Sequence, residues 1–285
     1  MSSIPQTSGD GLLERYSALL LDAYGVLVHT GGPMRGAAAF LDKVLHRKIP
    51  YFILTNDASK QPDTASRRYR SFGLPIPAER IITSGGLLAG YFRQHGLEGA
   101  RCAVLGPADT EEYVRQAGGE VVPPGAPFEV LVSGDEAGFD FVPTVDAVLS
   151  QAFRQLDRGD RLHLLLPNPD RIYPRGDGEF GFAAGAIAAL IEAALEARYR
   201  DRRDLRFTPL GKPHAPMFRE ALRRLGPSRP VMIGDQPETD IRGARAVGID
   251  TVLVIGGVFP SPGGSALESL PEEMRPTWWL PSLAK

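Results

Sequence analysis

The chain has 285 residues, which is more than one small hydrophobic core usually holds, so we expect two domains. Its 32 basic and 34 acidic side chains give a net charge of -2, a balance that indicates neither a nucleic-acid partner nor an acidic tail. Cys102 is the one cysteine, which excludes an internal disulfide and is typical of a reducing compartment. Residues 1–10 lack a signal-peptide pattern, and no apolar run approaches the roughly 20 residues that span a bilayer, so we expect a cytoplasmic protein without a membrane partner.

Short apolar runs alternate with helical patterns at both ends of the sequence. Small, polar or turn-forming residues follow each run, which is the rhythm of a parallel sheet covered by helices on both faces. The pattern therefore predicts an α/β fold with a Rossmann-like, doubly wound parallel-sheet core. The expected strands are Leu19–Leu21, Tyr51–Leu54, Val231–Ile233 and Thr251–Ile255, and the expected helices are Arg35–His46, Met217–Leu225 and Ile241–Val247.

The middle of the sequence has the pattern of a second α/β unit. We place an inserted domain at residues 86–207, with residues 1–85 and 208–285 forming the core. A domain inserted beside a site is well placed to act as a lid. The expected strands of the insert are Cys102–Leu105, Glu129–Val132 and Leu162–Leu166, and its expected helices are Thr110–Ala117 and Val145–Leu156.

Polar side chains follow three of the four expected core strands. Asp22 follows the first strand, Thr55 and Asn56 follow the second, and Asp235 follows the third. In open parallel sheets ligands bind at the carboxyl ends of the strands, so we expect these groups to converge. Taken alone, Asp22 is more readily explained as a cap of the next turn, Thr55 and Asn56 are more readily explained as an ordinary turn or helix cap, and Lys212 would be an ordinary exposed lysine.

The segment Gly234–Asp240 carries two carboxylates, Asp235 at the expected strand tip and Asp240 at the start of the next helix. Magnesium is a hard cation that takes oxygen ligands, and one carboxylate from Asp22 with one from Asp235 would suit it. Asp240 would support Asp235 or accept a hydrogen bond from a metal-bound water. Alone, Asp240 is also consistent with a helix N-terminal cap.

In combination, these motifs resemble the four motifs of the haloacid dehalogenase superfamily. Motif one is Leu21–Leu27, motif two is Leu54–Asn56, motif three is Lys212, and motif four is Gly234–Asp240. The long insertion between motifs two and three is similar to the large α/β cap of the sugar-phosphatase-like class, which includes the N-acetylglucosamine-operon nucleotidase and the 4-nitrophenyl phosphatases. Within the insert, Val132–Asp135 with Phe139–Phe141, and Asn168–Asp170 with Gly181–Leu190, resemble cap segments of that class.

The resemblance implies a chemistry for these positions. Asp22 would attack phosphorus and form an aspartyl-phosphate that water hydrolyses. Thr55 and Asn56 would bind the transferring phosphoryl group, and Lys212 would offset negative charge. Mg²⁺ would be bound by the side chains of Asp22, Asp235 and Asp240 and by the backbone carbonyl of Tyr24. A small phosphorylated substrate would be bound by Tyr24, Gly25, Asp57, Asn168 and Asp170.

The sequence departs from the phosphatase pattern at Tyr24, where those enzymes carry a second aspartate as general acid and base. A phenol with a pKa of about 10 is a poor base at neutral pH, and losing this help typically costs roughly 10²–10⁴-fold in rate. Three functions stay open: a slow Mg²⁺-dependent phosphatase, a non-catalytic binder of phosphorylated ligands, and a carbon–halogen hydrolase. The halogen-cleaving members also carry tyrosine at this position, but the retained motif four and the position of the insert argue against that function.

The sequence leaves the substrate undefined. Specificity would depend on the cap surface, where the candidates are Asp135, Phe139, Phe141, Asn168 and Arg171. At least one of the two phenylalanines is better explained as cap core. The resemblance also allows a homodimer.

Overall fold

A computed structural model of the chain describes residues 4–176, 178–257 and 264–284, and it divides into two compact units. Unit 1 contains Met1–Thr55, Pro62–Ile82 and Lys212–Lys285. Unit 2 contains Thr83–Gly211 and also the short segment Asn56–Gln61. Within the described residues, no helix is both long and apolar enough to cross a membrane.

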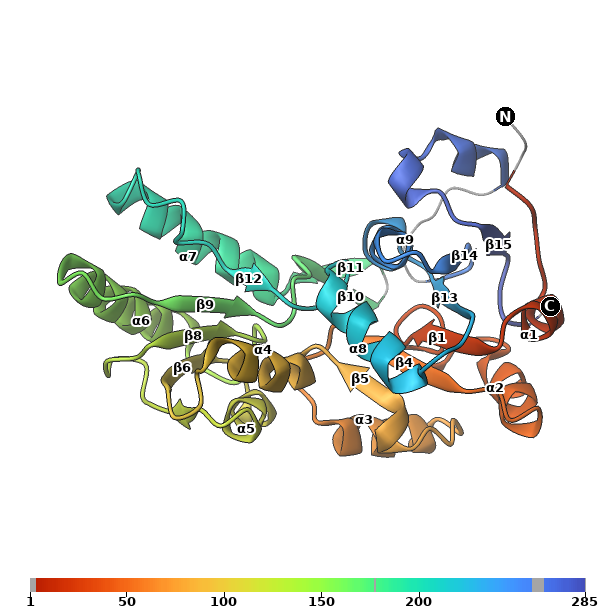
Figure 1. Ribbon diagram of the computed structural model, residues 1–285, viewed down its shortest axis with the longest axis horizontal. Coiled ribbons are helices and arrows are strands. Elements are labelled where there is room, and N and C mark those ends of the chain that lie inside the picture. Colours follow the sequence, from red (N-terminus) through yellow and green to blue (C-terminus); the bar gives the residue numbers. More distant parts are fainter. Residues whose placement is uncertain (1–3, 177, 258–263, 285) are drawn as a thin grey trace. The chain divides into compact units, whose positions relative to one another are not determined.

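Unit 1 is built on a sheet that has six strands among the described residues, in the order β15-β14-β13-β1-β4-β5 (Figure 1). The pairs β1–β13, β1–β4, β13–β14 and β14–β15 are parallel, which is typical of buried strands joined by helical connections. β1 lies at the centre, where Leu21 is opposite Ile233 and Asp22 is opposite Leu54. The strands are β1 (Ala18–Asp22), β4 (Tyr51–Thr55), β5 (Ile81–Thr83), β13 (Pro230–Gly234), β14 (Asp250–Val254) and β15 (Trp278–Leu280).

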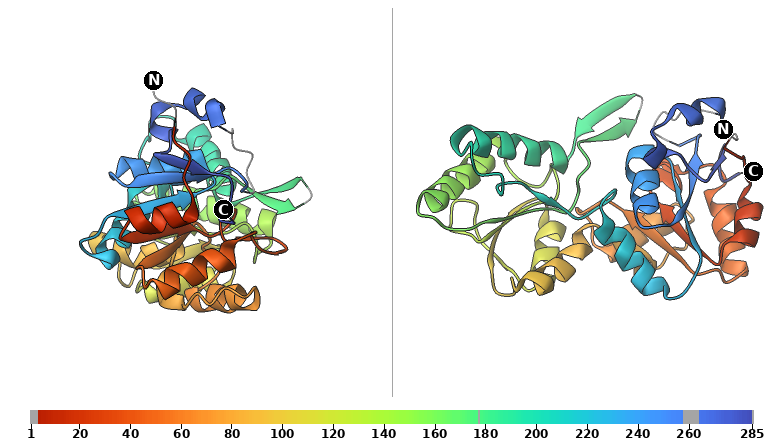
Figure 2. Two further views of the ribbon diagram at one scale, coloured as in Figure 1. Left: turned by 90° about the vertical axis from the view of Figure 1, so that its right-hand side faces the viewer. Right: turned by 45° about the horizontal axis from the view of Figure 1, so that its top comes forward.

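Helices cover both faces of this sheet (Figure 2). Alternate residues of a strand face opposite sides, so Leu19 and Leu21 belong to one apolar cluster, which also includes Leu12, Leu41 and Tyr69. That cluster packs α1 (Gly9–Arg15), α2 (Ala37–His46) and α3 (Pro62–Ser71) on one face. On the opposite face lie α8 (Ala215–Leu225) and α9 (Arg242–Ala246), and a short hairpin of β2 (Val28–His29) and β3 (Gly32–Pro33) follows β1.

Unit 2 has its own sheet, with five strands in the described part of the chain and the order β12-β9-β8-β6-β7. Its separate apolar core includes Phe128, Leu131, Val148 and Ile187, all of which are almost fully buried. An antiparallel hairpin, β10–β11, projects from this unit (Figure 2). The elements are β6 (Arg101–Leu105), β7 (Glu120–Val121), β8 (Val130–Ser133), β9 (His163–Leu166), β10 (Ile172–Gly176), β11 (Glu179–Phe182), β12 (Thr208–Pro209), α4 (Leu88–His95), α5 (Ala108–Gln116), α6 (Phe141–Asp157) and α7 (Ala184–Arg198).

The expected core strands are present, with ends that differ by one residue or so from the predicted ones. The expected helix Arg35–His46 begins at Ala37, because Gly36 has a left-handed φ of 87°. The expected helix Ile241–Val247 corresponds to α9, and a π-helical turn that the sequence did not indicate, Pro237–Ile241, precedes it. In this turn both Asp240 and Ile241 donate their N–H to Gln236 O.

Candidate active site

Asp22 is the last residue of β1, a strand whose five residues are all buried. Asp22 is only 4% exposed, because the buried strand that precedes it carries it into the interior. Asp22 Oδ1 accepts hydrogen bonds from Ala23 N at 2.7 Å and from Lys212 Nζ at 2.6 Å. The carboxylate is therefore oriented by one backbone and one side-chain donor.

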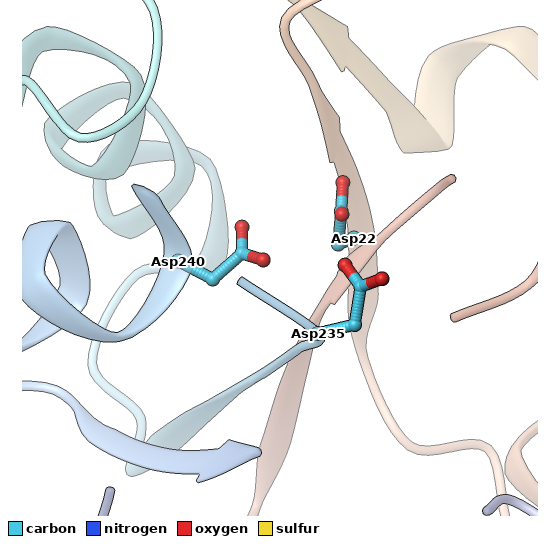
Figure 3. A group of neighbouring side chains, drawn as sticks. All are labelled: Asp22, Asp235 and Asp240. Atoms are coloured by element: carbon cyan, nitrogen blue, oxygen red, sulfur yellow. The ribbon is translucent and has the colours of Figure 1, made fainter. Parts of the chain in front are cut away.

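Asp235, directly after β13, and Asp240, in the π-helical turn that follows, bring a second and a third carboxylate to the same place (Figure 3). Asp235 and Asp240 are completely buried, and one carboxylate oxygen from each lies within 4.8 Å of the others and of Asp22. Asp240 Oδ2 accepts a hydrogen bond from Gln236 N at 3.2 Å, which folds the turn back on itself. Gly234 is required here because an added Cβ would overlap the Asp240 side chain.

Lys212 is the counter-charge of this cluster. Its Nζ donates to Asp22 Oδ1 at 2.6 Å and to Asp240 Oδ1 at 2.7 Å, and its side chain is 3% exposed. Burial alone would lower the pKa of Lys212, but the two carboxylates raise it, and the net shift is upward. Burial raises the pKa of Asp22 well above its usual range, and Asp240 and Asp235 add to that effect more than Lys212 offsets it. The positions of these groups thus favour the charged form of Lys212 and disfavour the charged form of Asp22.

The cluster fits a hard divalent cation. With its three carboxylates ionised and Lys212 protonated, the cluster carries a net charge of -2, and oxygen atoms are the donors that Mg²⁺ prefers. Gly25 and Gly257 flank Asp235, and an added Cβ on either would overlap its carboxylate. The backbone of these two glycines therefore lies directly against the Asp235 carboxylate. Gly25 also has a φ of +91°, which other residues rarely adopt.

Tyr24 and Gly25 lie in the turn after β1. Gly25 N donates to Val28 O at 2.8 Å, which closes the turn. The Tyr24 side chain is partly buried and packs against the apolar cluster of unit 1. Among the described residues its hydroxyl has no hydrogen-bond partner.

Thr55 ends β4, next to the tip of β1, and it is buried. The next residue, Asn56, belongs to unit 2, as do the predicted substrate-binding residues Asp57, Asn168 and Asp170. Within that unit Asn56 Nδ2 donates to Asp170 Oδ1 at 2.9 Å. The predicted site residues are therefore divided between the two units.

The other candidate substrate-binding residues differ in their surroundings. Asp57 forms an ion pair with Lys60 at 2.9 Å and accepts hydrogen bonds from Ser59 N and Oγ. Burial raises the pKa of Asp135, and the nearby Asp57 carboxylate adds to the rise. Phe139 and Phe141 pack against the apolar core of unit 2, as the plainer interpretation of them predicts.

The sequence pattern did not single out Lys60, Ser84 or Gly257. Lys60 pairs with Asp57, Ser84 Oγ donates to Asn56 O at 2.7 Å, and Gly257 flanks Asp235. The Gly256-Gly257 pair that ends the fourth expected strand was the one available signal, because glycine after a strand indicates a close backbone approach.

Two family models match the chain. One, described as haloacid dehalogenase-like hydrolase, matches residues 19–120, and another of the same kind, described as HAD-hydrolase-like, matches residues 209–285. These ranges contain the predicted motifs and lie on either side of most of unit 2.

Similar proteins carry phosphatase names. A dihydroxyacetone phosphatase of Corynebacterium glutamicum is 31% identical over 242 residues, which cover 84% of this chain and 81% of the relative. The ribonucleotide monophosphatase NagD of Escherichia coli is 26% identical over 269 residues, 94% of this chain and 96% of the relative. A crystal structure from Cytophaga hutchinsonii, described as a possible sugar phosphatase, aligns with a TM-score of 0.83 at 28% identity and covers 99% of both chains. The chain therefore belongs to the haloacid dehalogenase-like hydrolases, in the group that contains NagD and the 4-nitrophenyl phosphatases.

Proposed function

We propose that the protein is a Mg²⁺-dependent phosphatase that hydrolyses a small phosphorylated metabolite through an aspartyl-phosphate on Asp22. The observation that carries the proposal is the buried cluster of Asp22, Asp235 and Asp240 with Lys212. Its excess negative charge suits one divalent cation, and its central carboxylate stands at the tip of the middle strand. The relatives named as phosphatases support the reaction class.

In the proposed first step, an Asp22 carboxylate oxygen forms a bond to phosphorus as the bond from phosphorus to the leaving oxygen breaks. Lys212, held 2.6 Å from Asp22, favours the ionised form of that carboxylate and offsets negative charge on the phosphoryl oxygens. Thr55 would donate a hydrogen bond to the same group from the tip of the neighbouring strand. Water then cleaves the aspartyl-phosphate, which returns Asp22 and releases inorganic phosphate.

Asp22, Asp235 and the Tyr24 backbone oxygen would hold the metal ion, with Asp240 supporting the arrangement through Gln236 and Lys212. When bound, Mg²⁺ supplies positive charge that stabilises the charge spread over the phosphoryl oxygens. We further propose that residues 86–207 act as the cap that covers this site and contacts the leaving group.

Tyr24 sets the expected substrate preference. The leaving oxygen lacks the carboxylic acid that would protonate it, so substrates with good leaving groups should react fastest. We expect measurable but slow hydrolysis of small sugar phosphates, the class indicated by the names of the relatives. The near-neutral charge and single cysteine favour a cytoplasmic enzyme without a nucleic-acid partner.

A phosphate-release screen tests the proposal. Wild type, Asp22→Asn and Tyr24→Asp are assayed with Mg²⁺ against triose, pentose and hexose phosphates, nucleoside monophosphates, and aryl and acyl phosphates. We expect release by wild type, faster release by Tyr24→Asp, and none by Asp22→Asn or in the presence of a chelator. If wild type and Tyr24→Asp are both inert over the whole panel, the proposal fails. If only Tyr24→Asp is active, a non-catalytic binder is the better description.

A further inference from the structure

The segment Asn56–Gln61 leaves the sheet of unit 1 directly after Thr55, but it belongs to unit 2. Side chains of unit 2 bind its backbone at several points. Thr110 Oγ1 donates to Ala58 O at 2.9 Å, the Tyr113 hydroxyl donates to Lys60 O at 2.5 Å, and Gln61 N donates to Asp109 Oδ2 at 2.9 Å. The segment is therefore fixed along its length within unit 2.

Asn56 is the first residue of this segment, and its carboxamide is held from more than one side. Its Nδ2 donates to Asp170 Oδ1 at 2.9 Å, and its backbone oxygen accepts from Ser84 Oγ at 2.7 Å. An added Cβ on Gly211 would lie 2.5 Å from Asn56 Oδ1, so the chain passes close to the other end of the carboxamide. Asn56 is buried, and these contacts define which end of the amide faces Asp170.

Asp170 is itself fixed by backbone contacts that do not involve its carboxylate. Its N–H donates to Asn168 Oδ1 at 3.1 Å, and its carbonyl oxygen accepts from Gly185 N, in the first turn of α7, at 2.9 Å. Gly185 leaves no room for a side chain against Asp170 O. Substituting the Asp170 side chain should therefore leave the backbone in place and remove the contact with Asn56.

We propose that Asp170 is a positioning residue, which orients the Asn56 carboxamide for binding the transferring phosphoryl group. This rests on the proposed function, and it replaces the predicted direct contact of Asp170 with substrate. A carboxylate acceptor is a stronger partner for an amide N–H than a neutral one, so it holds one orientation of the carboxamide. Because Asp170 acts through Asn56, its effect on turnover should vanish when Asn56 has no carboxamide.

A double-mutant cycle with Asn56→Ala and Asp170→Ala tests this role. We expect Asp170→Ala to lower kcat by about 10–100-fold, since small misplacement of a binding group can cost about 100-fold. In the Asn56→Ala background the same change should alter kcat by less than about twofold, because the two residues act as one unit. Asp170→Asn, which keeps an acceptor oxygen, should recover most of the lost rate. Asp157→Ala, which removes an exposed carboxylate of unit 2 paired with Arg198, is the matched control and should match wild type.

Two results would overturn the role: wild-type kcat in Asp170→Ala, or an equal loss in both backgrounds, which would mean that Asp170 contacts the substrate directly. Urea unfolding of each variant separates a folding defect from a positional one. If wild type releases no phosphate from any compound, the proposed function fails separately. The same cycle is then run on the Kd of orthophosphate with Mg²⁺ present, where non-additive losses support the Asp170 role and additive or absent losses overturn it. A wild type that also fails to bind orthophosphate would overturn both proposals.

Discussion

Lys212 Nζ lies 2.6 Å from Asp22 Oδ1, although 190 residues separate the two in the chain. The same ammonium donates to Asp240 at 2.7 Å, so it joins the tip of β1 to the turn that follows β13. Because Lys212 is almost completely buried, carboxylates and not water balance its charge. The chemistry of the site and the stability of unit 1 therefore depend on one cluster.

Lys212→Met should lower the free energy of unfolding by about 3 kcal/mol in the presence of a chelator, because the buried carboxylates of Asp22 and Asp240 then lose the ammonium that pairs with both. Added Mg²⁺ should restore more stability to this variant than it adds to wild type, since the cation then supplies positive charge that Lys212 no longer provides. Urea denaturation with EDTA and with Mg²⁺ measures both effects.

The control for this comparison is Lys43→Met. Lys43 is about half exposed and pairs with Asp10 at 2.8 Å, so its removal should cost less than about 1 kcal/mol under either condition. Equal stability of Lys212→Met and wild type in EDTA would show that the carboxylates are not ionised together in the metal-free protein.

Gly25→Ala should disrupt the site more than its backbone strain alone explains. Gly25 has a φ of +91°, and an added Cβ would overlap the carboxylate of Asp235. Gly73→Ala is the matched control, because Gly73 has a φ of +77° and no atom within 4 Å of the added Cβ. We expect Gly73→Ala to cost about 1 kcal/mol of stability with unchanged activity.

For Gly25→Ala we expect a larger loss of stability and a fall in kcat of about 100-fold or more, because Asp235 must move. Thermal unfolding and phosphate release by both variants provide the comparison. Similar behaviour of the two alanine variants would mean that Asp235 can shift without consequence.

The strand tips were the most predictable part of this molecule. Apolar runs that end in Asp22 and Asp235 indicated buried parallel strands, and the topology of such sheets brings their carboxyl ends to one edge. That reasoning needs only local pattern and general topology. It predicted the convergence of Asp22 and Asp235, which the structure shows.

Features that depend on tertiary contacts were not predictable. The π-helical turn that returns Asp240 toward Lys212 depends on packing, and an ordinary helix start has the same sequence pattern. Likewise, nothing in the residues Asn56–Gln61 indicates that their partners are Asp109, Thr110 and Tyr113, about 50 positions later in the chain. Hydrophobic periodicity reports which face of an element is buried, but it does not report which distant side chain will bind a loop.

Tyr24→Phe should keep kcat within about twofold of wild type. The Tyr24 ring packs against the apolar cluster of unit 1, and its hydroxyl has no hydrogen-bond partner among the described residues. The phenol should therefore take no part in proton transfer, and the measured rate should depend on the leaving group. We expect wild type and Tyr24→Phe to prefer aryl phosphates over alkyl phosphates to the same extent. In Tyr24→Asp the ratio of the two rates should be smaller by about 10²-fold.

The kcat/KM ratio for 4-nitrophenyl phosphate and a simple alkyl phosphate measures this preference in each variant. A loss of more than about tenfold in Tyr24→Phe with either substrate would assign the hydroxyl a direct role in the reaction.

The ion pairs of Glu220 should make the stability of the folded protein depend on pH, independently of the candidate active site. The Glu220 carboxylate accepts hydrogen bonds from Arg223 and Arg224 in α8, and these arginines lower the pKa of Glu220 from 4.5 to about 2. The folded state thus binds fewer protons than the unfolded state between these values. The stabilisation is present in full above about pH 4.5, and it is lost as the pH falls toward 2.

Glu220→Gln should therefore be less stable than wild type at pH 6.5, and the difference should shrink steadily between pH 4.5 and pH 3. The difference should not exceed about 1 kcal/mol, because the Arg223 side chain is 71% exposed and water screens the pair. Urea denaturation at pH 6.5, 4.5 and 3.5 gives the three values, with Glu238→Gln as a control at an exposed carboxylate. A difference that stays constant over this range would mean that Glu220 stabilises α8 through packing of its side chain, because only a charge effect disappears when the carboxylate is protonated.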